Sequence, residues 1–140
     1  MLFRSWVLPP RRAGWLLALL MIAISAPSLA AERSFPFDSE LMLDSRPMKG
    51  SKRVPVIGIG RNGEATIDLW CNSIEGQIVV IESTISVMTG AKTDRQCDAA
   101  RMRGDEDLLA ALQQVTSWSR DGDVVTLRGG KTLRFRQPTN

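Results

Sequence analysis

Few residues of this sequence could carry out chemistry, and no histidine is among its 140 residues. Without histidine the chain has no Ser-His-Asp or Cys-His catalytic centre, no histidine-ligated zinc and no histidine pH switch. The residues left to weigh are the acidic run Asp105, Glu106 and Asp107, and the adjacent Ser51 and Lys52. A carboxylate pair across a cleft is typical of glycosidases, and a Ser-Lys pair of some hydrolases. Neighbouring residues of a helix or an extended segment point apart, however, so neither arrangement predicts an active site.

Residues 1–30 have the pattern of a secretory signal peptide. Arg4, Arg11 and Arg12 form a positive region ahead of the uncharged, mostly apolar run 14–26. Small residues then lead to Ala30, after which we expect cleavage. A helix of that apolar length rises only about 20 Å, short of the roughly 30 Å hydrocarbon layer, so an uncleaved membrane anchor is the weaker alternative. The prediction is a periplasmic or secreted protein with no stable membrane span after cleavage.

The charge balance argues against a nucleic-acid partner. The chain has 18 Lys+Arg against 15 Asp+Glu, a net charge of +3 and a pI near 9.3. The excess of basic residues lies entirely in the predicted signal peptide, so the mature chain is neutral overall. Nucleic-acid binding needs a clustered basic face instead. The roughly 110 residues left after cleavage suffice for one domain, which we expect to be a monomer.

Cys71 and Cys97 both belong to the mature part of the chain. An even number of cysteines in an exported chain predicts a disulfide, the alternative being two buried free thiols that never meet. A nucleophilic Cys71 would need a neighbour that stabilises its thiolate, such as Arg95. Two thiolates without histidine fall short of four zinc ligands, so we expect neither a metal nor a cofactor.

Short runs rich in β-branched residues predict a mostly β chain. Residues 31–52 read as an irregular leader with an edge strand around residues 40–43. The Asn62-Gly63 pair is typical of a hairpin turn, and a helical turn is expected near residues 97–102. The main strands are expected at residues 54–59, 64–70, 77–82, 84–88, 116–120, 123–128 and 131–136.

One longer helix is predicted, with its start at Asp105. Acidic residues in a first turn complement the helix dipole, and three of them stand here in succession. The helix carries one apolar stripe, which we expect to pack on the sheet. The stripe consists of Leu108, Leu109, Leu112 and Val115.

From Cys71 to its end, the chain resembles the META domain, the HslJ-like family of heat-shock-associated bacterial envelope proteins. The run Cys71-Asn72, with Gly76 shortly after it, is similar to the family's Gly-Cys-Asn…Gly signature. Thr93 to Cys97 matches the Thr-x-x-x-Cys element that follows. An acidic-headed helix and a final Leu-x-Phe come next, in the family's order.

The resemblance implies a META-like domain over residues 53–137, preceded by the leader. Its fold would be mainly β (α+β), an antiparallel barrel-like curled sheet with one packed amphipathic helix. Asn72, Gly76 and Thr93 would be structural, and the family offers no catalytic residue to carry over. One departure is Trp70, which stands where the family usually has glycine.

Two places could serve binding. Basic residues crowd the predicted C-terminal strands and could meet an anionic envelope surface, unless they form a solvated face that protects a strand edge. These residues are Arg120, Arg128, Lys131, Arg134 and Arg136. The barrel interior could hold an apolar ligand, unless side chains such as Trp118 and Phe135 fill it.

The residues and the resemblance together predict an exported, non-enzymatic protein of the cell envelope, stress-associated and acting by binding. Its partner would be an envelope protein or an anionic envelope surface. The alternative is a periplasmic small-ligand carrier, or an inhibitor of a hydrolase that attacks the envelope.

Overall fold

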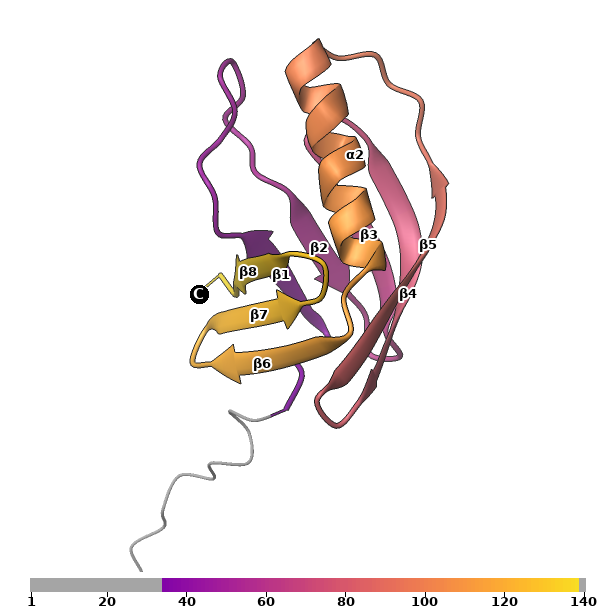
Figure 1. The fold of residues 1–140 in the computed structure, drawn as a ribbon, viewed down its shortest axis with the longest axis vertical. Helices are drawn as coiled ribbons and strands as arrows, with labels where there is room; N and C mark the ends of the chain where they lie inside the picture. Colours follow the sequence, from indigo (N-terminus) through magenta and orange to yellow (C-terminus); the bar gives the residue numbers. More distant parts are fainter. Residues whose placement is uncertain (1–33, 139–140) are drawn as a thin grey trace, which may run out of the picture.

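The computed structural model describes residues 34–138 (Figure 1). The predicted signal peptide, residues 1–30, lies outside the described residues, so export and cleavage stay predictions. Within the described range no helix is long and apolar enough to cross a membrane. This range holds eight strands and the helix α2 (Ala99–Gln113). The strands are β1 (Ser39–Leu43), β2 (Val56–Ile59), β3 (Glu64–Asp68), β4 (Ser73–Ile81), β5 (Thr84–Lys92), β6 (Ser117–Asp121), β7 (Val124–Arg128) and β8 (Thr132–Arg136).

The strands form a closed barrel in which each strand pairs with the next in the chain and β8 pairs back with β1. All of these pairings are antiparallel. The predicted mainly β fold with one helix is therefore confirmed. Two seams are short, because β1 and β8 share only two residue pairs and β5 meets β6 only at Thr84 and Ser117. Figure 1 shows α2 lying along β5, with its lower end leading into β6.

Inward side chains fill the barrel. Along β3, for example, Ala65 and Ile67 are buried between exposed neighbours, which is the period-two pattern of a strand with one wet face. The core is mostly aliphatic, and Phe35, Trp118 and Phe135 are its aromatic members. Since these side chains pack into one cluster, the interior is better described as a core than as a ligand site.

Tight turns join the predicted hairpins. The turn at Asn62-Gly63 connects β2 to β3, as predicted. Gly63 has a φ of +84°, which favours glycine, and a Cβ there would collide with the carbonyl oxygen of Ile78. The next two strands, β4 and β5, are nine residues each and therefore longer than the sequence pattern predicts.

The leader predicted at residues 31–52 is partly wrong, because it contains a strand of the barrel. β1 lies near the expected position, yet it has neighbours on both sides and is no edge strand. Only Leu41 of its five residues is fully buried, while Met42 is exposed and Leu43 half-buried. The strand itself was expected, but nothing in its five residues indicates that it has a partner on both sides.

The predicted helix start at Asp105 is wrong, because α2 begins six residues earlier at Ala99. Asp98 is the N-cap, with extended backbone, and its side chain accepts a hydrogen bond from the backbone N–H of Arg101 at 3.1 Å. Asp105 lies in the middle of the helix and is fully buried. The apolar stripe is confirmed for Leu108 and Leu112, which are buried, and for Leu109, which packs half-buried against the core. Val115 is also buried but is not part of the helix, which ends at Gln113.

Candidate functional site

A buried polar cluster holds α2 against the barrel. The Asp105 carboxylate, buried in the helix, accepts hydrogen bonds from the backbone N–H groups of Cys71 and Asn72, each at 2.9 Å. The side-chain amide of Asn72 donates a third bond to it, at 3.1 Å. A buried carboxylate is costly unless such donors surround it, so the cluster fixes the helix to the β3–β4 connection.

Asn72 extends the same cluster to a third segment of the chain. Its Oδ1 accepts hydrogen bonds from the Thr93 hydroxyl at 2.8 Å and from the Arg95 N–H at 2.6 Å. The Thr93 hydroxyl oxygen in turn accepts a bond from the N–H of Ser73. Asn72 therefore ties the end of β5 and the following loop to the start of β4.

The signature residues divide between this cluster and the sheet. Cys71 and Cys97 form the predicted disulfide, which closes the loop ahead of α2. Thr93 and Asn72 lie beside it in the hydrogen-bonded cluster. Gly76 lies apart from them in β4, at a bulge, where a Cβ would collide with the carbonyl oxygen of Met88. A close approach of two strands therefore accounts for this glycine.

Trp70, which stands where the family usually has glycine, packs its indole over helix α2. A Cβ added to Gly104 of α2 would lie 2.7 Å from Cδ1 of Trp70 and 2.5 Å from Cε of Met48. The missing side chain at Gly104 thus makes room for the indole. Trp70 and Gly104 form a matched pair, and this pair explains a helix with glycine at a buried position.

The structure gives other roles to the three groups that could have been catalytic, namely the acidic run at Asp105, the Ser51-Lys52 pair and the Cys71 thiol. Asp105 is occupied by the buried cluster, while Glu106 is exposed beside it. The hydroxyl of Ser51 accepts a hydrogen bond from the Arg53 N–H. Cys71 is bonded to Cys97 and is therefore not a thiolate.

An open cleft of about 700 Å³ lies beside the disulfide. We call it the disulfide cleft. One row of outward residues, paired in register across β1 to β4, crosses it. That row consists of Met42, Val56, Asp68 and Ser73. Trp70, Cys71 and Cys97 line it on the side of the buried cluster. The other lining residues are Glu40, Ser51, Lys52, Arg53, Val54, Leu69, Asn72, Arg95 and Arg101.

Three cations on the walls of this cleft have no ionic partner among residues 34–138. They are Lys52, Arg53 and Arg95. Arg101, by contrast, pairs with Asp98 at 2.6 Å. The hydrogen bond from the Arg101 backbone N–H is the main cause that lowers the pKa of Asp98.

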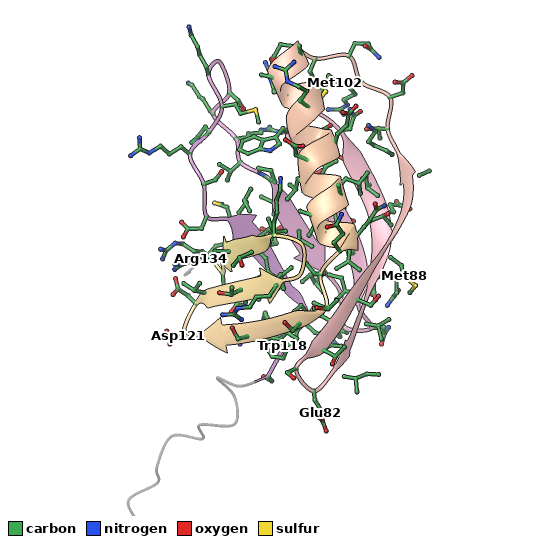
Figure 2. All side chains as sticks on the ribbon, in the orientation of Figure 1. Glu82, Met88, Met102, Trp118, Asp121 and Arg134 are labelled. Carbon is green, nitrogen blue, oxygen red and sulfur yellow. A yellow bond between two sulfur atoms is a disulfide. The ribbon has the colours of Figure 1, made fainter. Side chains whose placement is uncertain are left out.

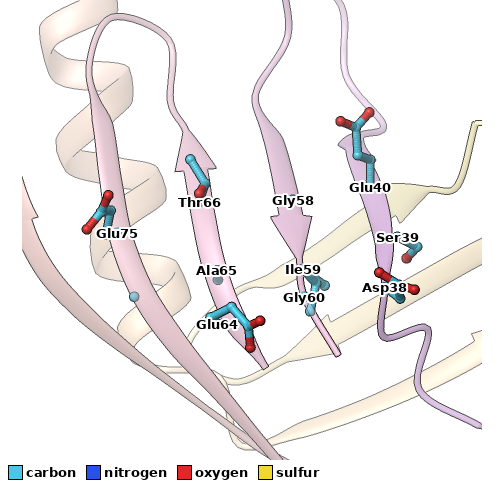
Figure 3. Close-up of a pocket in the computed structure, with 11 residues that line it drawn as sticks. Asp38, Ser39, Glu40, Gly58, Ile59, Gly60, Glu64, Ala65, Thr66 and Glu75 are labelled. Atoms are coloured by element: carbon cyan, nitrogen blue, oxygen red, sulfur yellow. The ribbon is translucent and has the colours of Figure 1, made fainter. Parts of the chain in front are cut away.

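A second depression, of about 630 Å³, lies on the same outer face, one row further along the strands (Figure 3). We call it the acidic groove. Glu40, Gly58, Thr66 and Glu75 pair in register across its floor. The missing side chain of Gly58 keeps the floor of this depression low, because a Cβ there would have only one neighbour within 4 Å, a carbonyl oxygen at 3.8 Å. No three acidic side chains of the described residues come together as a metal site would require.

The predicted basic residues do not form one strip. Arg128, Arg134 and Arg136 lie on the outer face of β7 and β8, with Lys131 in the turn between them. Arg120 instead shares the face of buried Trp118 on β6 and reaches past the strand end. It donates hydrogen bonds to the Gly122 carbonyl and the Gln137 side chain.

Acidic neighbours already partner part of that outer face. The Asp44 carboxylate lies 3.9 Å from Arg134 and 3.2 Å from Arg136, which also approaches Asp123 at 3.8 Å. The hydrogen bond to Asp44 is the main cause that raises the pKa of Arg136. Because these arginines already have acidic partners, the outer face of β7 and β8 attracts an anion less strongly than unpaired arginines would.

Two residues organise this region in roles that were not predicted, Asp98 as the helix N-cap and Asp105 as the buried carboxylate. Asp98 carried a readable signal, because an aspartate directly before Ala-Ala-Arg-Met is typical of a helix N-cap. Asp105 carried no such signal, because the N–H groups that donate hydrogen bonds to its carboxylate belong to residues more than thirty positions away.

Comparison with known proteins agrees with this geometry. No curated protein matches the chain. Among solved structures, the NMR structure of a protein from Burkholderia xenovorans is similar, with a TM-score of 0.59 and 18% sequence identity over 74% of this chain and 84% of that one. At that identity the likeness shows the fold alone. The family model of the META domain matches residues 39–140, from β1 to the end, and the chain therefore belongs to the META domain family.

Proposed function

We propose that this protein is exported to the cell envelope, is associated with stress, and acts by binding at the disulfide cleft rather than by catalysis. The proposed export rests on the pattern of residues 1–30 and on the disulfide, since disulfides persist in oxidising compartments. Membership of the META family supports the link to envelope stress.

One observation carries the binding role: the signature cysteines line an open cleft outside a filled barrel. A carrier of the common barrel type holds its ligand inside the strands, whereas here aliphatic and aromatic side chains occupy that space. The cleft instead exposes the apolar side chain of Met42, beside cations that lack ionic partners among the described residues. Concave, partly apolar surface with a few polar groups is what a binding site needs.

Site-specific crosslinking in the host tests this proposal. A photoreactive amino acid replaces Met42 in the cleft of the full-length chain, with Lys131 in the β7–β8 turn as the matched control position. Adducts in the envelope fraction are then identified by mass spectrometry, with and without envelope stress. We expect a discrete adduct from Met42 that increases under stress. Equal adducts at both positions, or a chain retained in the cytoplasm, would count against the proposal.

The inhibitor remains a second candidate because of one feature, the tip of the β4–β5 hairpin. Figure 2 shows Glu82 at this tip, projecting beyond the barrel. Ile81 is 70% exposed, and Val79 and Met88 expose large apolar surface on the same hairpin. Protruding apolar tips suit insertion into another protein's groove. A photoreactive group at Ile81 that captures a hydrolase would favour this candidate over the first.

A further inference from the structure

The disulfide cleft combines exposed apolar surface with a separation of charge. Met42 is 43% exposed at its floor, and Val56 lies beside it as the paired residue of β2. Trp70, half-buried over α2, continues the apolar lining toward the disulfide. An apolar chain lying on these three side chains would remove them from water, which is favourable in proportion to the area covered.

The charges around this apolar surface differ between its two ends. Arg53 and Arg95 line the cleft and have no ionic partner among residues 34–138. Glu40 lines both this cleft and the acidic groove, where Glu75 and Glu64 add further negative charge. Asp68 adds one more carboxylate on the floor of the cleft, beside Val56, so the acidic group of a ligand is favoured only at the arginine end. An anionic group is therefore attracted toward the arginines and repelled from the Glu40 end.

We propose that the disulfide cleft binds a small anionic amphiphile, a single apolar chain that ends in an acidic group. This ligand class rests on the binding function proposed above and specifies it. The apolar chain lies along Met42, Val56 and Trp70, and the acidic group meets Arg53 and Arg95. The volume of about 700 Å³ is in the range of small-molecule sites, and a concave surface suits single molecules better than a flat bilayer.

An NMR titration of the exported, oxidised protein tests the ligand class. The probe is decanoate, kept below the concentration at which it forms micelles, and nonyltrimethylammonium is the cationic probe with the same alkyl chain. We expect saturable shifts of the Trp70 indole N–H and the Arg95 amide, with decanoate binding about tenfold tighter than the ammonium compound. Equal affinity for the two head groups would overturn the proposal.

Matched variants locate the site. Met42→Glu places a negative charge on the floor of the cleft and should weaken decanoate binding about tenfold. Met88→Glu adds the same charge at a similarly exposed methionine of β5 and should leave the affinity unchanged. Both positions are exposed, so both variants are expected to fold. Equal losses in the two variants would mean that general repulsion, and not this cleft, governs binding.

The remaining outcomes separate the ligand class from the proposed function. Shifts that occur only with anionic phosphatidylglycerol vesicles would replace the small ligand by a membrane surface. Failure of decanoate to bind, together with a discrete stress-dependent adduct at Met42, would refute the ligand class and leave the proposed function standing. Failure of both experiments would refute both.

Discussion

Replacing Asp105 by alanine should destabilise the protein strongly, although the two acidic residues that follow it are exposed. The carboxylate is fully buried and accepts hydrogen bonds from Cys71 N, Asn72 N and Asn72 Nδ2. Alanine would leave these three donors without a partner, at about 1–3 kcal/mol for each donor that water does not reach. Because Cys71 is only half-buried, water can reach part of this site. The expected total is therefore about 3–5 kcal/mol.

The geometry also predicts the order of two milder variants. Asp105→Asn keeps one oxygen acceptor but turns an NH₂ group toward at least one donor, so it should cost about half as much as alanine. Glu106→Ala changes the exposed neighbour and should stay within about 0.5 kcal/mol of the parent.

Urea unfolding followed by circular dichroism measures these differences, provided that the urea dependence of the free energy is unchanged. If Asp105→Ala is too unstable to study, Thr93→Val removes the bond to Asn72 Oδ1 at the edge of the same cluster and should cost about 1–2 kcal/mol. An Asp105→Ala variant as stable as Glu106→Ala would refute the structural role assigned to the cluster.

Four further predictions concern the helix and the disulfide. Leu112→Ala should cost about 2–5 kcal/mol by urea unfolding, because Leu112 is fully buried; a cost near zero would contradict its place in the core. Reducing the disulfide should remove about 3.5 kcal/mol, seen calorimetrically as a melting temperature lower by about 10 °C or more; an unchanged temperature would contradict the bond. The lowered pKa of Asp98 means that its carboxylate stabilises the fold above about pH 4 and that this contribution is lost as the pH falls through the folded-state pKa. The stability difference between the parent and Asp98→Asn should accordingly shrink in acid, and a difference that does not change with pH would refute this. Gly104→Ala should destabilise the parent by about 1–3 kcal/mol and cost less in a Trp70→Ala background, where only the flexible end of Met48 still meets the new Cβ. Equal effects in a double-mutant cycle would show that the two sites are independent.

Most of the barrel could be predicted because its strands depend on local patterns. In β3, alternating Ala65 and Ile67 specify a buried face, and Asn62-Gly63 specifies the turn before it. β1 could not be recognised as a barrel strand in the same way. Its place in the barrel depends on pairing with β8, where the paired residues lie more than ninety positions away, and no local pattern reports such a partner.

The candidate site could be predicted only in part, for a similar reason. The cysteine pairing followed from composition and predicted compartment, and the structure contains it. The predicted helix start at Asp105 was wrong because acidic residues near a helix N-terminus are only a general preference, whereas the N-cap at Asp98 marks the start itself. The role of Asp105 depends on donors from the β3–β4 connection, and the cleft depends on the register of four strands. Neither can be read from a single segment.

The pairing of the first strand with the last has a consequence for how the chain is made. A polypeptide that leaves a ribosome or a translocation pore N-terminus first presents β1 long before β8, which ends at Arg136. One edge of β1 therefore stays unpaired until β8 has emerged. The barrel cannot close before β8 is available to pair with β1. A chain truncated before β8 would keep two open edges, and open edges invite pairing between molecules. Closure of the barrel therefore requires that β8 has emerged.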